Sequence, residues 1–155
     1  DTGGYTPAGN EPVYNAVSMV SAIEVNGTAV GEVQSLSIEI SNNMREQRAI
    51  GSQGPAGVGT GQFVVTGSMT IYFANNTLYN IFLQDQDFSF FLELDDNSGA
   101  TSGNIMSFTM GKVKFGNVTR TIPGNNQDVL LVADYQAIYD STQGGTIEIA
   151  TTDAV

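Results

Sequence analysis

The chain has 155 residues, enough for one domain with a sizeable core. Sixteen acidic residues against five basic ones leave a net charge of −11, which argues against a protein that grips nucleic acid through clustered Lys or Arg. His and Cys are absent, so no Ser-His-Asp or Cys-His triad can be built, and zinc and copper lose their usual ligands. We therefore expect no enzymatic activity, cofactor or metal. The sequence has no apolar run of membrane-spanning length, so we also expect no membrane contact.

The two ends of the chain differ in composition from its middle. Residues 1–15 are rich in Gly, Pro and polar side chains, which favours an arm or linker. We therefore divide the chain into an arm at 1–16, a domain at 17–150 and a tail at 151–155. Because the chain starts at Asp1 rather than Met, we expect either a removed start or a longer parent protein.

Two strands begin the predicted domain. Residues 17–25 read as a strand, and Asn26-Gly27 is a strong signal for a two-residue hairpin turn. Residues 33–41 form the next strand, in which polar and aliphatic side chains alternate. The alternation predicts an aliphatic side and a polar side, made respectively of Leu36, Ile38 and Ile40, and of Ser35, Ser37, Glu39 and Ser41.

Residues 42–61 form a long loop, charged in its first half and rich in glycine in its second. A structureless loop of this length is uncommon in a compact domain and is usually functional or interfacial. Its Gly57-x-Gly59-x-Gly61 run lacks the Lys of a phosphate-binding loop and precedes a strand rather than a helix. We therefore expect an extended loop at an interface and no phosphate site.

A second alternating strand and one short helix follow the loop. Residues 62–73 predict a strand with one apolar and one polar face. Asn75 or Asn76 can cap a helix that ends near Gln84 and turns Leu78, Ile81 and Phe82 to one side. The remaining predicted elements are strands at 88–94, 104–115 (with Gly111 at a bulge), 127–140 and 146–150, and a loop at 116–126 that contains Arg120 and Pro123. Seven or so strands and one helix predict a mostly-β sandwich or rolled barrel.

Paired acids are the remaining candidates for chemistry. Asp85 with Asp87, and Asp95 with Asp96, could act as acid and base, but Asp is also a common turn residue. The segment from Asp95 weakly resembles a calcium loop, yet its twelfth position holds Met106 instead of a bidentate acid. We take turn formation as the better interpretation of both pairs. The bases Lys112, Lys114 and Arg120 are too few for a nucleic-acid patch, and we expect them to pair with acids of a neighbouring copy.

Four segments in a fixed order carry a family resemblance. They are Asn42-Asn43 at the start of the loop, Thr66-Gly67-Ser68-Met69-Thr70 in a strand, Leu78-Tyr79-x-x-Phe82 in the helix, and Lys112-Val113-Lys114-Phe115. Over residues 17–149 the chain resembles the tail tube proteins of long-tailed bacteriophages, of the siphophage type.

The resemblance implies the tail-tube fold, a β-sandwich with one flanking helix. It further implies rings of six domains, an inner β-barrel shared by the ring, and a long loop and an arm that bridge stacked rings. Some family members carry two such domains in one chain. The expected function is a self-assembling structural subunit in the virion tail, built in the host cytoplasm, that conducts DNA during ejection. The implied partners are other copies, a tape measure protein and DNA in the lumen, a tail terminator, and baseplate or tip proteins.

Combining the polar strand faces with this resemblance gives candidate site residues. We expect the lumen to be lined by Ser35, Ser37, Glu39, Thr66, Ser68, Thr70, Asp128, Asp134 and Gln136. We expect contacts between rings at Arg45, Glu46, Arg48, Gly51, Gly54 and Gly57. A negative bore would repel the phosphates of DNA and keep it from sticking.

Three other interpretations stay open at this point. A secreted β-sandwich adhesin or carbohydrate-binding module would fit the acidity, but it predicts a Trp or a complete calcium site. A glycoside hydrolase would use one of the acid pairs. The tube of a contractile injection system would share the expected fold.

Overall fold

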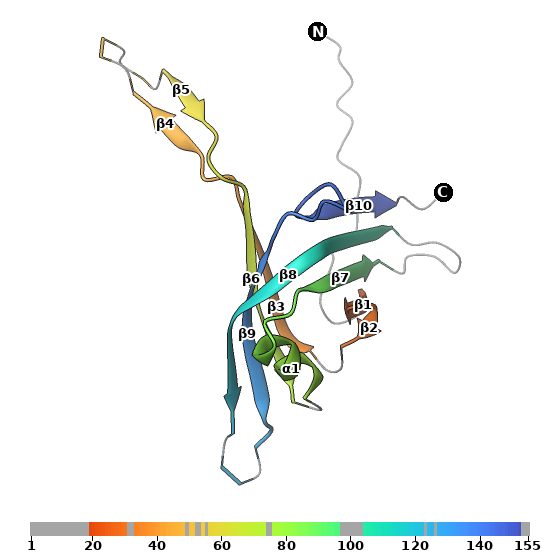
Figure 1. Ribbon diagram of the computed structural model, residues 1–155. Coiled ribbons are helices and arrows are strands. Elements are labelled where there is room, and N and C mark those ends of the chain that lie inside the picture. Colours follow the sequence, from red (N-terminus) through yellow and green to blue (C-terminus); the bar gives the residue numbers. More distant parts are fainter. Residues whose placement is uncertain are drawn as a thin grey trace, which may run out of the picture.

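The computed structural model describes residues 19–30, 33–48, 50–51, 54, 56–73, 76–96, 104–122, 124–125 and 127–152. Within these ranges most residues lie in strands, and one short helix is present (Figure 1). The elements are β1 (Val20–Val25), β2 (Thr28–Ala29), β3 (Val33–Ser41), β4 (Arg45–Gln47), β5 (Gly57–Gly59), β6 (Val64–Tyr72), α1 (Thr77–Leu83), β7 (Phe88–Asp95), β8 (Ile105–Thr121), β9 (Leu130–Ala137) and β10 (Glu148–Thr152).

Eight of the strands form one antiparallel sheet in the order β2-β1-β7-β8-β9-β6-β3, with β10 beside β8. The long strand β8 pairs with β7 from Ile105 to Val113 and with β9 from Val113 to Thr121. Figure 1 shows β8 passing from the neighbourhood of β7 to that of β9. We call the group made by β3, β6, β9 and the second half of β8 the wall sheet.

The core is formed by side chains from both halves of the sheet. Val65 and Tyr135 of the wall sheet are buried in one cluster with Phe88 and Phe90 of β7 and with Met110 of β8. This arrangement, a mostly-β fold with a flanking helix, is the predicted one. The aliphatic and polar sides predicted for residues 62–73 also match, since Val65, Met69 and Ile71 are buried and the residues between them are less so.

Tyr135 crosses beneath β6 to reach the outermost wall strand. Its hydroxyl donates a hydrogen bond of 2.7 Å to the backbone carbonyl of Ser37. The ring passes over Gly67, where an added Cβ would collide with the Tyr135 ring and with Ser37. Its ring also stacks on Phe90, with centroids 5.8 Å apart. Burial raises the pKa of Tyr135 to about 12, so the hydroxyl stays a proton donor across the physiological range.

Two bulges determine the course of β8. One extra β8 residue lies between Met110 and Val113 opposite β7, as Gly111 predicted, and a second lies between Phe115 and Asn117 opposite β9. The second bulge shifts the two-residue alternation by one position, so Phe115 and Val118 both pack against the core. The predicted loop at 116–126 is therefore wrong in its first half, because β8 continues to Thr121.

The other boundaries need smaller corrections. The Asn26-Gly27 turn is confirmed, with both residues at positive φ (52° and 68°) between the paired strands β1 and β2. Asn76 is the N-cap of α1, but its side chain makes no capping hydrogen bond. The strand predicted at 127–140 is shorter, and β10 runs on to Thr152 into the expected tail. The arm expected at 1–16 lies outside the described residues.

Candidate functional site

The polar face of the wall sheet is built from residues that stand side by side in strand register. One row across the sheet joins Glu39, Thr66, Gln136 and Lys114; the next joins Ser37, Ser68, Asp134 and Asn117; the third joins Ser35, Thr70, Val132 and Thr119. Side chains of directly paired residues lie on the same face of a sheet. The structure thus brings eight of the nine predicted lumen residues onto one surface.

The surface is open. A shallow hollow of about 420 Å³ lies over it, and Ser37, Glu39, Thr66, Asp134 and Gln136 contribute to its lining. The hydroxyls of Ser37 and Ser68 are 2.9 Å apart, and the Ser68 backbone N–H donates to the Ser37 hydroxyl. Ser37 and Ser68 thus satisfy each other at the centre of this face.

The predicted set has one outlier and missed two neighbours. Asp128 is exposed but precedes β9, so no strand pairing fixes its position. Asn117 and Thr119 belong to the second and third rows, although the sequence placed them in a loop. The alternation of Asn117, Val118 and Thr119 could have identified them, had the bulge at Gly116 been recognised.

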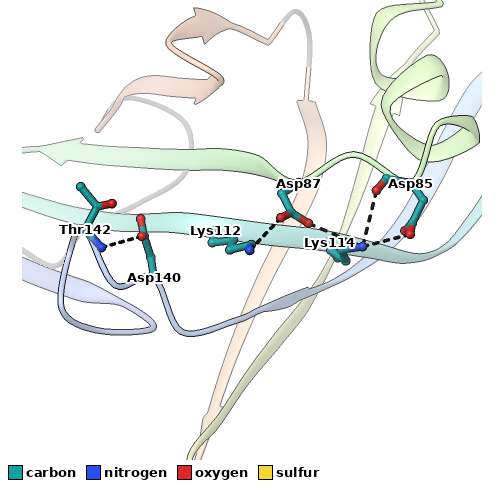
Figure 2. A network of polar contacts seen from close by, with 6 residues as sticks. All are labelled: Asp85, Asp87, Lys112, Lys114, Asp140 and Thr142. Atoms are coloured by element: carbon teal, nitrogen blue, oxygen red, sulfur yellow. Dashed lines mark hydrogen bonds and ion pairs between the residues drawn. The ribbon is translucent and has the colours of Figure 1, made fainter.

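The charge on this face is negative. Glu39 and Asp134 are exposed acids in adjacent rows. Lys114 is the cation in the same rows, and its ammonium lies 3.0 Å from Asp85 and 3.6 Å from Asp87, which follow α1 (Figure 2). The hydrogen bond to Asp85 raises the pKa of Lys114, so the ammonium stays protonated. Its positive charge is balanced by the two neighbouring carboxylates.

Lys112 belongs to the same network. Its ammonium lies 2.9 Å from Asp87, and this hydrogen bond lowers the pKa of the Asp87 carboxyl. Asp85 and Asp87 thus clamp the end of the helix to β8 through two lysines (Figure 2). The interpretation of these acids as turn residues is consistent with the positive φ of Asp85 (49°).

Arg120 lies on the opposite side of β8 from the polar rows. Its guanidinium carbon is 5.4 Å from the ring centroid of Phe73 and 5.5 Å from that of Tyr79, within the range of cation–π contacts. All three predicted pairing bases therefore have partners inside the chain. Their pairing with a neighbouring copy stays a prediction.

The prediction of a structureless loop at 42–61 is wrong, because strands on either side of its middle form a two-stranded ribbon. Strands β4 and β5 pair antiparallel from Arg45 opposite Gly59 to Gln47 opposite Gly57. Figure 1 shows this ribbon extending beyond the body from the ends of β3 and β6. We call the segment from Asn42 to Gly61 the ribbon.

Alternate glycines make the ribbon possible. The Gln47 side chain lies against β5, 3.2 Å from where a Cβ of Gly57 would stand and 2.9 Å from one at Gly59. A Cβ at Gly61 would collide with the backbone of Asn43. The Gly57-x-Gly59-x-Gly61 run therefore allows close approach of two chain segments. Of the other predicted interface residues, Arg48 pairs with Glu46 at 3.0 Å, and Gly51 has a positive φ of 91°.

The described residues show no cluster suited to metal binding. No group of three or more acids among them could hold a metal ion. The buried carboxylate of Asp96 accepts hydrogen bonds from the backbone and side-chain nitrogens of Asn104, which is a structural role. Residues 97–103 of the calcium-like segment lie outside the described part. In that part no helix is long and apolar enough to cross a membrane.

Comparison with solved structures identifies proteins of the same fold. A chain from a cryo-EM structure of the PVC sheath/tube terminator, from an extracellular contractile injection system, aligns with a TM-score of 0.65 and 12% identity, covering 93% of this chain and 99% of that one. A chain from the anti-feeding prophage tube-terminating cap aligns with a TM-score of 0.66 and 11% identity, covering 95% of this chain and 97% of that one. A chain from the PVC sheath-tube complex aligns with a TM-score of 0.60 and 13% identity, covering 92% of this chain and 91% of that one.

Sequence comparison goes further than the fold. A comparison with curated proteins finds no match. The family model described as phage tail tube protein, in contrast, matches residues 1–137, which include β1 to β9 and therefore the whole wall sheet. The chain therefore belongs to the phage tail tube protein family.

Proposed function

We propose that copies of this tail tube subunit close side by side into six-domain rings, and that stacked rings enclose an acidic bore that conducts DNA during ejection. The observation that carries the proposal is the polar face of the wall sheet, where Glu39, Asp134 and short hydroxyl side chains stand in register on one surface. Its opposite face is the core, so this surface is the one available to face water.

The edges of the wall sheet support closure into a ring. Among the described residues β3 pairs with β6 alone, and β8 beyond Val113 pairs with β9 alone. Free edges invite association with another chain. Because the four wall strands alternate in direction, β3 of one copy and β8 of the next run antiparallel and can pair without a break in the pattern.

Negative charge in the bore suits a conduit. Glu39 and Asp134 would repeat around every ring, and Lys114 is neutralised by Asp85 and Asp87. A surface of this sign repels phosphate, so DNA passes without lasting contacts. The tape measure protein and DNA are the proposed occupants of the bore, and the tail terminator and the baseplate or tip proteins are the proposed partners at its ends.

Electron microscopy of the purified protein tests the assembly. We expect rings or stacked tubes with the polar face turned inward. A map that places Glu39 and Asp134 on the outer wall would contradict the lumen assignment. Replacing both acids by Lys should leave tubes intact but slow DNA ejection, whereas Glu148→Lys on β10 is the matched control outside the wall sheet.

The ribbon is proposed to join successive rings. Deletion of residues 51–59 should leave the core and the wall sheet folded but stop rings from stacking. Normal tubes from the deletion variant would exclude this role. Assembly takes place in the host cytoplasm in this proposal, and the tube ends in the virion tail.

The likeness to chains from contractile injection systems favours one second candidate, a tube that lies inside a contractile sheath. The sheet and core would be the same in either case. Co-expression with a candidate sheath protein would distinguish them, since a sheathed tube should purify as a complex.

A further inference from the structure

The ribbon exposes apolar side chains that the described part of its own chain does not cover. Met44 is 70% exposed, Val58 65%, and Ile50 at the far end is fully exposed. Val58 stands opposite Glu46, and Met44 immediately precedes β4. A two-stranded ribbon is marginally stable in water by itself. These side chains therefore need a partner surface.

An apolar groove lies elsewhere on the molecule. It has a volume of about 170 Å³, and β1, the β1–β2 turn, the end of β6, the start of β9 and α1 surround it. This volume is below the range of about 300–1,000 Å³ that is usual for small-molecule sites. It suits one or two apolar side chains. Its lining includes Val25, Ala29, Val30, Ile71, Leu78 and Ile81.

The ribbon and the groove lie at opposite ends of one strand. The ribbon joins β6 just before Val64, whereas Ile71, Tyr72 and Phe73 at the other end of β6 line the groove. The nine residues of β6 span about 30 Å at 3.3 Å per residue. A copy stacked in the same orientation thus presents its groove end to the ribbon end of the copy below it. Such a head-to-tail contact repeats indefinitely along a stack.

Charge supports the same pairing. The ribbon holds Arg45 and Arg48, two of the five basic residues of the chain, but Glu46 is its single acid among sixteen. It therefore carries a small net positive charge in a strongly acidic molecule. Another copy offers a body of opposite sign, which favours docking of the ribbon on that body.

We infer that the groove between α1 and the β1–β2 turn receives apolar side chains of the ribbon, Ile50 at its tip followed by Val58 in β5, from a copy in the next ring. The inference rests on the proposed stacking of rings and names the receiving surface. It makes the ribbon and the groove the two halves of one heterologous contact.

Disulfide crosslinking tests this contact cleanly, because the chain contains no cysteine. The double variant Ile50→Cys with Ala29→Cys is assembled, oxidised and run on a non-reducing gel. We expect a ladder of linked chains, since each copy carries both halves of the contact. Each single variant should give no ladder. The pair Ile50→Cys with Thr142→Cys is the matched control, because Thr142 is exposed and lies outside the groove.

The outcomes separate this inference from the proposed function. Tubes that form without a ladder overturn the groove as receiver and leave ring stacking intact. Dimers alone would mean tip-to-tip contact and overturn it as well. An internal link within one chain in a Val13→Cys, Ala29→Cys variant would show that the chain's own arm fills the groove. Absence of rings and tubes from the unmodified protein would remove both proposals.

A second measurement needs no crosslink. Ile50→Asp places a charge in the proposed apolar contact, and we expect the concentration needed for tube formation to rise by about tenfold or more. Thr142→Asp adds the same charge at an exposed turn and should change this concentration little. Equal behaviour of the two variants would overturn the inference.

Discussion

The body and the ribbon of this subunit are made of similar strands but are stabilised in different ways. In the body, Val65, Met110 and Val113 have no exposed surface, and pairing extends over eight strands. In the ribbon, β4 is exposed throughout and the apolar Val58 faces solvent. The body thus buries its apolar side chains within the chain, whereas the described residues of the chain leave those of the ribbon uncovered. In the proposed assembly, the body is the part that folds and the ribbon is the part that connects.

Truncation of an apolar side chain should show the largest contrast. Phe90 is 1% exposed and stacks on Tyr135, so Phe90→Ala should lower the free energy of unfolding by about 3–5 kcal/mol. Ile50→Ala in the ribbon should change it by less than about 0.5 kcal/mol. Urea unfolding of the unassembled protein measures both. Comparable losses would mean that the ribbon is part of the folded core after all.

Adding one methyl group at a glycine should give the next largest contrast. At Gly67 the new Cβ collides with the Tyr135 ring and the Ser37 backbone, which cannot move easily, and Gly67→Ala should cost about 1–3 kcal/mol. At Gly59 the new Cβ meets the end of the flexible Gln47 side chain at 2.9 Å. Gly59→Ala should therefore be tolerated by the folded body. Thermal melts compare them, and Gly116→Ala is a control in the body because the nearest atom is 4.0 Å away.

The Tyr135 hydroxyl should give a moderate, pH-dependent effect. Its pKa in the fold, about 12, is above its ordinary value of 10.0. The contribution of the hydroxyl to the stability of the fold is therefore full below pH 10 and is lost as the pH rises toward 12. Tyr135→Phe should cost about 0.5–1.5 kcal/mol at neutral pH and remove this part of the alkaline loss. Stability measured from pH 8 to 12 checks it. An unchanged alkaline profile would argue against the buried Tyr135 hydroxyl as the source of the alkaline loss.

Ion pairs should give the smallest contrast. Lys112 lowers the pKa of Asp87. The contribution of Asp87 to the stability of the fold is therefore present above its ordinary pKa of 3.8 and is lost as the pH falls below that value. Asp87→Asn should therefore destabilise the body slightly at neutral pH and not at low pH. Arg48→Ala breaks the exposed ribbon pair with Glu46 and should leave unfolding unchanged within error. Acid titrations followed by circular dichroism distinguish the two variants.

The sequence predicted the polar wall well because its signal is local. Alternation in β3 and β6 identifies a face residue by residue, and strand pairing then confirms that Glu39, Thr66 and Gln136 are neighbours. Family resemblance supplied the wider fold. The same alternation failed at Gly116, because a bulge shifts the period and is determined by pairing with a distant strand.

The prediction of a structureless loop in place of the ribbon was wrong for a related reason. Glycine at every second position usually indicates a flexible segment, and propensity alone cannot show that another strand lies across it. The glycines at 57 and 59 are explained by the side chain of Gln47, which lies against both of them. Gln47 is ten residues from Gly57 in the sequence. The groove could not be predicted at all, since five separate elements surround it and no single motif marks it.

The hydrogen bond from Tyr135 to Ser37 has a consequence for the thermodynamics of association. Ser37 lies in β3, the outermost wall strand, which would otherwise fray at a free edge. Anchoring its backbone from beneath β6 removes conformational freedom during folding of the single chain. The entropy loss of ordering that strand is then not repeated when a neighbour binds it, so each association step keeps more of its interaction energy. In the proposed ring, one buried hydroxyl thereby orders β3 before a neighbouring copy pairs with it.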